Sequence, residues 1–98
     1  MVHLTLSEMA ALTGRGEVSP IELVEAHLAR IERVNPALNA FVEVFAGEAR
    51  VAARSAESSA RRGPLHGVPV TVKDSFDVEG KPTLCGSRFR LGHRAARD

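Results

Sequence analysis

Apolar residues recur at helical spacing in three stretches before residue 63, and this pattern predicts three helices. Thr5 and Glu8 have the spacing of a capping box at the start of the first helix. Gly14 is suited to the left-handed conformation that often follows a helix end, so we expect the first helix to stop there. The predicted helices cover about 5–14, 19–34 and 47–62.

The second predicted helix has the strongest signals. Ser19 is placed as its N-cap, Pro20 as its first helical residue and Glu22 as the reciprocal cap. Its apolar stripe consists of Ile21, Val24, Leu28 and Ile31, and is widened by Leu23 and Val34. His27 falls inside this stripe, where packing is the ordinary role of a lone histidine. The helix is expected to end at the Asn-Pro pair that includes Pro36, because proline disfavours the helical conformation of the residue before it.

Two further segments, about 40–45 and 68–73, are rich in β-branched and aromatic residues and predict strands. In the second, Val68, Val70 and Val72 share one face, while Pro69, Thr71 and Lys73 share the other. A strand, a helix and a strand with a connection of this length predict a parallel, right-handed βαβ unit.

The predicted fold class is therefore α/β, with helices followed by a βαβ unit. Two strands do not make a stable parallel sheet, which needs both of its faces covered. The third helix carries small residues that allow close packing against another element: Ala49, Ala52, Ala53, Ala56 and Ala60. We therefore interpret residues 1–98 as the N-terminal fragment of one larger α/β domain with an incomplete sheet.

Composition narrows the picture only slightly. The 98 residues are 44% hydrophobic and 26% charged, which is typical of a globular chain, and the net charge of +1 indicates no partner. The single cysteine, Cys85, excludes an internal disulfide and has no cluster of metal ligands beside it, so we expect neither a metal nor a cofactor. No signal peptide or membrane-spanning run is visible, and the expected compartment is the cytoplasm.

The stretch "GPLHGVPVTVKDSFDVEGKPTLCGS", residues 63–87, resembles the N-terminal portion of the amidase signature family. The upstream stretch "SPIELVEAHLARIERVNPALNAFVEV" is similar to the opening helix and first strand of that family. The family includes small-molecule amidases and the glutaminase subunit of tRNA-dependent amidotransferases. The resemblance implies a hydrolase that cleaves carboxylic amide C–N bonds, with a small-molecule amide as substrate. It implies a nucleic-acid partner only for a tRNA amidotransferase subunit.

The resemblance also assigns a role to Lys73. In the family, the lysine of the "VKD" segment belongs to a Ser–cis-Ser–Lys triad, and Lys73 is the matching residue. A lysine acts as a base only in its neutral form, and burial favours that form because it penalises the charge. Neutral lysine can accept a proton through a bridging serine and so activate a second serine to attack an amide carbonyl. On pattern alone, a lysine at a strand end is usually a solvated residue.

The two catalytic serines of the family lie in a Gly/Ser-rich stretch downstream of the lysine, and residues 1–98 contain no such stretch. Ser75 and Ser87 are interpreted as loop residues, and Cys85 as a small residue in a turn. His66 is expected in a turn, and Asp74 either orients the loop after the strand or is solvated. We therefore expect residues 1–98 to be inactive without the C-terminal part of the domain. The alternative is a stand-alone small α/β interaction module, or a decayed remnant without catalysis.

Overall fold

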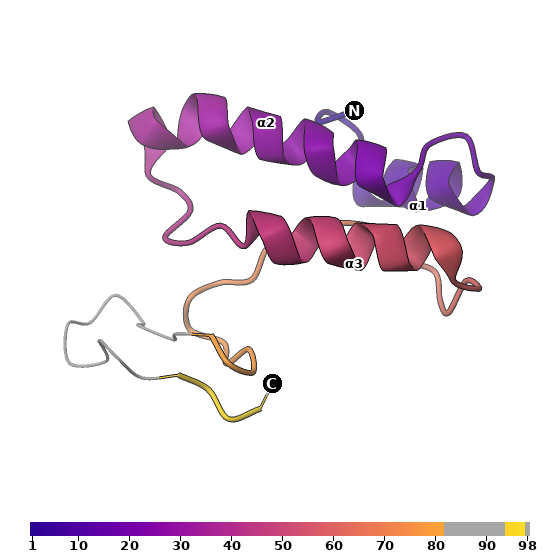
Figure 1. The fold of residues 1–98 in the computed structure, drawn as a ribbon. Helices are drawn as coiled ribbons and strands as arrows, with labels where there is room; N and C mark the ends of the chain where they lie inside the picture. The colour runs from indigo at the N-terminus through magenta and orange to yellow at the C-terminus, as the bar shows by residue number, and fades with distance from the viewer. Residues whose placement is uncertain (82–93, 98) are drawn as a thin grey trace.

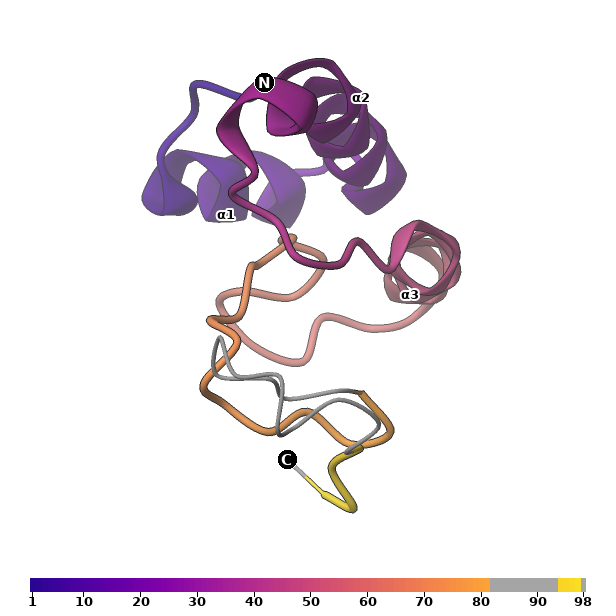
Figure 2. The same cartoon turned by 90° about the vertical axis from the view of Figure 1, so that its left-hand side faces the viewer.

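The computed structural model describes residues 1–81 and 94–97, and this part of the chain is built from three helices (Figure 1). They are α1 (Leu6–Gly14), α2 (Pro20–Leu38) and α3 (Ala46–Ser58). Helices α2 and α3 lie side by side and run antiparallel, joined by the loop after Leu38 (Figure 1). The segment that leaves α3 passes back along this helix, and residues 63–81 lie beside α3 and below α1 and α2 in Figure 2.

Helices α1 and α2 begin where the sequence predicts. The backbone N–H of Glu8 donates to Thr5 Oγ1 at 3.1 Å, and the carboxylate of Glu8 accepts from the backbone of Thr5. At the start of α2, the N–H of Glu22 donates to Ser19 Oγ at 3.2 Å and the N–H of Ser19 donates to Glu22 Oε2 at 2.8 Å. Both capping boxes are confirmed, because each depends only on residues three positions apart.

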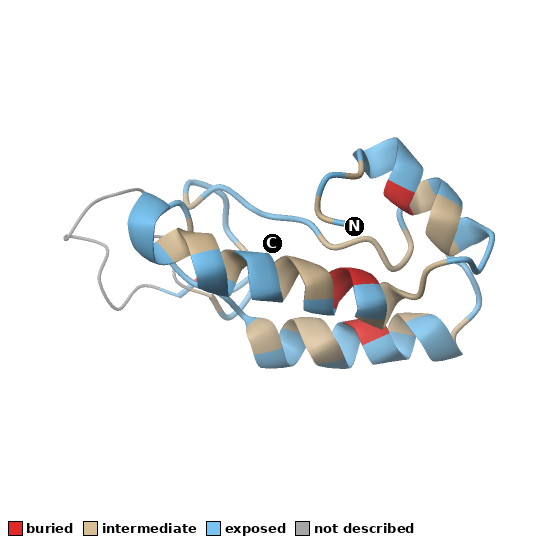
Figure 3. Ribbon diagram, turned by 90° about the horizontal axis from the view of Figure 1, so that it is seen from above, coloured by how far each residue is buried: buried red, intermediate tan, exposed pale blue. Residues whose placement is uncertain are grey.

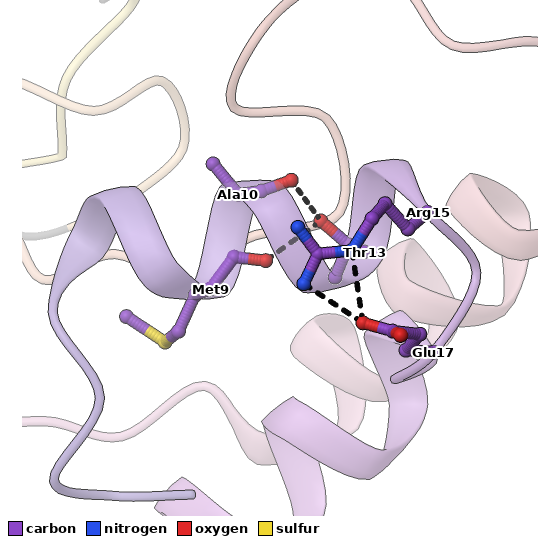
Figure 4. A network of polar contacts seen from close by, with 5 residues as sticks. All are labelled: Met9, Ala10, Thr13, Arg15 and Glu17. Carbon is purple, nitrogen blue, oxygen red and sulfur yellow. Dashed lines mark hydrogen bonds and ion pairs between the residues drawn. The ribbon is translucent and has the colours of Figure 1, made fainter.

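The left-handed residue after α1 is not Gly14, as predicted, but Gly16, with a φ of +72°. Gly14 remains in the helix, and Thr13 Oγ1 donates to the carbonyl oxygens of Met9 at 2.9 Å and Ala10 at 3.1 Å (Figure 4). The turn that follows is braced by an ion pair between Arg15 and Glu17, which the same view shows. The last helical residue is therefore the predicted one, but the left-handed turn comes two residues later.

Helix α2 continues through Pro36 to Leu38, so the prediction that the Asn-Pro pair ends it is wrong. A proline in the last turn removes only one backbone donor, and the side chain of Asn35 ties the turn to the following loop. The amide of this side chain accepts from the N–H of Phe41 at 2.8 Å and donates to its carbonyl at 3.1 Å. Asn39, with a φ of 51°, then ends the helix in the left-handed conformation.

Helix α3 ends at Ser58, four residues before the predicted end at 62. Ser58 Oγ donates to the carbonyls of Arg54 and Ser55, and Ser59 is already extended, with φ −110° and ψ 159°. Serine hydroxyls compete with backbone donors for carbonyls near a helix end, which favours termination here. Residues after Ser59 are then free to turn back along α3.

The segments predicted as strands are loops in the part of the chain that the structure describes. Residues 40–45 connect α2 to α3, and residues 68–73 pair with no other described segment. The bridge between Glu79 and Ala95 is the one isolated parallel pair among the described residues. A strand needs a neighbour to satisfy its backbone groups, and residues 1–81 and 94–97 provide none for these segments. The βαβ unit and the α/β class therefore remain predictions.

Three of the five buried apolar residues in the described part of the chain belong to the paired helices α2 and α3 (Figure 3). Leu23 is fully buried, and Val24 and Ala53 are buried beside it. Of the predicted alanine stripe, Ala53 is buried, which agrees with close packing of the helices at that point. Ala52 and Ala60 are exposed, and Ala60 lies beyond the end of α3, so the prediction of a continuous stripe is wrong there. On α1, Met9 is also buried.

An ion pair between Glu25 of α2 and Arg50 of α3 joins the exposed edge of the same interface. The hydrogen bond from Arg50 lowers the pKa of the Glu25 carboxyl, and the same contact raises the pKa of Arg50. Both groups are well exposed, so solvent screens the attraction and the pair contributes little to stability.

A second ion pair ties a distant segment to the beginning of α3. The Lys81 ammonium contacts the carboxylate of Glu48 and lies 4.3 Å from the ring centroid of Phe45. A cation over an aromatic ring gains about 0.5–1 kcal/mol at an exposed site.

Within residues 1–81 and 94–97, no helix is both long and apolar enough to cross a membrane.

Candidate active site

Lys73 lies exposed on the segment that follows the third helix. Its carbonyl accepts a hydrogen bond from the N–H of Phe76 at 3.0 Å, so residues 73–76 form a tight turn. Within this turn Asp74 is half-buried and Ser75 is exposed. The side chain of Lys73 therefore projects from the first residue of a turn rather than from the end of a paired strand.

A cavity of about 290 Å³ lies where the end of α1, the start of α2 and the end of α3 meet. Polar side chains contribute much of its lining: Thr13, Ser19, Glu57, Ser59, Arg61 and His66. Lys73 is not among the lining residues. The predicted base is therefore not part of this hollow, and none of the described hydroxyl groups in the lining is hydrogen-bonded to His66.

His66 lies in a turn, as predicted: its N–H donates to the carbonyl of Gly63 at 3.3 Å, and the N–H of Val68 donates to Leu65 at 3.0 Å. The imidazole also contacts α3, which the sequence pattern does not indicate. Its Nε2 lies 2.8 Å from the carbonyl oxygen of Ala56. His66 and Ala56 are ten residues apart, and no helix or strand periodicity links residues at that spacing. The contact forms because α3 ends at Ser58, which lets the chain turn back toward Ala56.

The remaining candidates from the sequence are His27, Cys85 and Ser87. The Nδ1 atom of His27 lies 2.7 Å from the carbonyl oxygen of Leu23, one turn earlier on the same helix, so this half-buried imidazole bonds to its own backbone. Cys85 and Ser87 lie outside the described residues. In the described ranges, no group of three or more His, Cys, Asp or Glu side chains is placed to hold a metal ion.

The amidase family model matches residues 22–98, a range that includes the turn at His66 and the segment with Lys73. The chain belongs to the amidase family. This confirms the resemblance identified from "GPLHGVPVTVKDSFDVEGKPTLCGS". The match also begins inside α2, so it takes in the α2–α3 pair as well as the segment that follows.

Relatives of this amidase-family chain share one name. It is 47% identical over 92 residues to the glutamyl-tRNA(Gln) amidotransferase A-subunit of Methylococcus capsulatus, covering 91% of this chain and 19% of that protein. It is 43% identical to the protein of the same name from Acidothermus cellulolyticus, covering 94% and 19%. For Halorhodospira halophila the identity is 42%, covering 100% and 21%. The chain thus spans about a fifth of the length of these curated relatives.

Proposed function

We propose that this chain is the N-terminal segment of an amidase-type enzyme that cleaves carboxylic amide C–N bonds, and that Lys73 is the general base of the reaction. The observation that carries the proposal is the family match over residues 22–98, which contains the "VKD" segment. Two serines from the remaining four-fifths of the domain would complete a Ser–cis-Ser–Lys triad.

The proposed chemistry uses Lys73 to move protons. The neutral amine accepts a proton from the bridging serine, which in turn takes the proton of the nucleophilic serine. The nucleophilic oxygen then bonds to the amide carbon, and backbone N–H groups stabilise the resulting oxyanion. As the C–N bond breaks, the proton returns through the bridging serine to the departing amine. Water or another nucleophile then releases the acyl group.

The exposure of Lys73 agrees with a site that is completed by other parts of the domain. Val70 and Phe76, three residues before and after it, are 69% and 65% exposed, so exposed apolar side chains flank Lys73 along the chain. Covering this segment would remove water from the ammonium group and favour its neutral form. The same covering would provide the dry environment in which fixed hydrogen-bond donors act most strongly on an oxyanion.

The test is substitution of Lys73 in the complete enzyme. Lys73→Ala should lower kcat for simple aliphatic and aryl amides by at least about 10³-fold, because triad members act as a unit. Lys73→Arg should be equally inactive, since a guanidinium does not release its proton. The matched control is Lys81→Arg, which keeps the charge beside Glu48 and should leave turnover unchanged. Ammonia release at the parental rate by the Lys73→Ala enzyme would refute the assignment.

The names of the relatives favour a glutamyl-tRNA(Gln) amidotransferase component over a free-standing amidase. On this proposal, the complete protein works with partner subunits and with glutamyl-tRNA. The discriminating measurement compares glutamine hydrolysis by the complete protein alone with hydrolysis in the presence of those partners. Stimulation by the partners supports the amidotransferase assignment, whereas full turnover without them supports a free-standing amidase.

A further inference from the structure

The imidazole of His66 contacts the last turn of α3, a helix to which its own segment does not belong. Its Nε2 lies 2.8 Å from the carbonyl oxygen of Ala56, in the last turn of α3. A carbonyl oxygen only accepts hydrogen bonds, so Nε2 must carry the hydrogen and donate it. The carbonyls of a last helical turn lack donors within the helix, and Ser59 Oγ approaches the same oxygen only to 3.5 Å. His66 is thus the closer donor to this helix end.

Gly67, the next residue, packs the same turn closely against α2. Gly67 has a φ of +80°, and an added Cβ would lie 2.6 Å from Cγ of Pro20, the first residue of α2. Such a distance is well below van der Waals contact, so only glycine allows the backbone to approach this closely.

A third contact reaches α1. Arg61 Nη2 donates to the carbonyl of Pro64 at 2.8 Å and lies 3.5 Å from the carbonyl of Ala10. Residues 61–68 are therefore held against all three helices, although none of these residues belongs to a helix.

Only residues 69–72 lie between this turn and Lys73, and they have few contacts that would fix their position. In the described part of the chain, residues 69–72 make no hydrogen bond or ion pair. The next supported residue is Lys73, through the turn that its carbonyl forms with Phe76. On its N-terminal side, the position of Lys73 therefore depends on where the turn at His66 and Gly67 is fixed.

We propose that His66 is a positioning residue for the amidase reaction: its Nε2–H bond to Ala56 fixes the turn from which the Lys73 segment departs. This inference rests on the proposed function of Lys73. It adds that the imidazole touches neither substrate nor reacting atoms, and that a neutral donor at the same place is sufficient.

The first test is spectroscopic and does not depend on activity. In the complete amidase labelled with ¹⁵N at histidine, the ring nitrogens of His66 should show a protonated Nε2 and a bare Nδ1 in the neutral imidazole. A neutral ring protonated at Nδ1 would overturn the proposal, because that tautomer cannot donate to Ala56.

The second test compares two amide side chains at position 66 in the complete amidase. Gln places its NH₂ where Nε2 lies, whereas Asn is too short to reach Ala56. His66→Asn should lower kcat by about 10–100-fold, as expected for a small misplacement of a reacting group, with KM nearly unchanged. His66→Gln should restore most of the lost kcat. Equal losses in the two variants, or parental kcat in His66→Asn, would overturn the inference.

Lys73→Ala, assayed beside these variants, separates the two proposals. If Lys73→Ala is inactive and His66→Asn has parental activity, the positioning role is wrong and the proposed function stands. If Lys73→Ala has parental activity, the proposed function fails and the positioning role fails with it.

Discussion

Single residues decide where α1 and α2 begin, where α2 and α3 end and how closely neighbouring segments approach. Ser19 and Thr5 open their helices through side-chain oxygens, while Asn39 and Ser59 close theirs through their backbone conformation. Gly67 is constrained in two ways: its backbone has a positive φ, and it lies against the side chain of Pro20. Of these residues, Gly67 should be the least tolerant of a side chain.

Gly67→Ala should destabilise the fold by about 1–3 kcal/mol, because alanine is strained at positive φ and its methyl would overlap Pro20. The matched control is Gly47→Ala in α3, where an added Cβ meets nothing within 4 Å. Alanine there should raise stability by up to about 1 kcal/mol. Urea titrations followed by far-ultraviolet circular dichroism measure both changes. A neutral Gly67→Ala would show that the turn does not pack on α2 as described.

At this scale the sequence predicts contacts between near neighbours and misses those between distant ones. The capping boxes at Thr5 and Ser19 follow from residues three apart, and the structure confirms both. The contact of His66 with Ala56 spans ten residues and two kinds of structure, so no periodicity points to it. The position of Lys73 in the amidase motif was found from a family resemblance, and its catalytic role stays a prediction.

At the scale of elements, the paired helices α2 and α3 form the best-defined part of the chain. Their buried contact uses Leu23 and Ala53, and the exposed edge is closed by Glu25 and Arg50. All three helices were predicted because amphipathic spacing and caps are local signals. The ends of α2 and α3 were mispredicted because Asn35 and Ser58 act through side-chain hydrogen bonds that a proline or glycine rule ignores.

The Glu25–Arg50 pair predicts a small dependence of stability on pH. Arg50 lowers the pKa of Glu25 in the folded chain, so the pair stabilises the fold above the unfolded pKa of about 4.3. This stabilisation is lost as the pH falls through the lower folded pKa. Glu25→Gln should therefore reduce the thermal midpoint by about 1–3 °C at pH 7 and by less near pH 3.

The control for this change is Glu43→Gln, an exposed carboxylate in the loop before α3 that makes no ion pair with a described residue. It should show no such pH-dependent difference. Scanning calorimetry in low salt gives the clearest comparison, because salt screens exposed charges. A loss in Glu25→Gln that is the same at both pH values would exclude the ion pair as its cause.

At the scale of the whole molecule, the chain has more apolar surface than three helices can bury. Its radius of gyration is 14.7 Å, compared with about 13 Å for a compact domain of 100 residues. Exposed valine and phenylalanine side chains lie in the two segments that were predicted as strands and just after them: Val42, Val44, Phe45, Val70, Val72 and Phe76. Neither segment has a neighbouring strand among the described residues, and these apolar side chains stay exposed.

This exposure predicts that residues 1–98 bind a hydrophobic dye such as ANS and unfold over a broad temperature range. Replacing both Val70 and Phe76 with serine should reduce the dye fluorescence markedly, because these are among the most exposed large apolar side chains described. Fluorescence and scanning calorimetry on the same monomeric sample provide the measurement. A sharp transition at high temperature without dye binding would mean that the chain buries this surface by itself.

Two contacts attach the segment from His66 to Lys81 to α3. Lys81 pairs with Glu48, and His66 contacts the carbonyl oxygen of Ala56. Glu48 and Ala56 are eight residues apart on the helix, a separation of about 12 Å along its axis. The fifteen residues from His66 to Lys81 can span about 50 Å when extended. The segment from His66 to Lys81 is therefore much longer than the distance between its two contacts on α3. Residues 68–73 can therefore straighten into a strand beside a neighbouring strand, beginning at the point that the turn at His66 fixes, while His66 and Lys81 stay attached to α3.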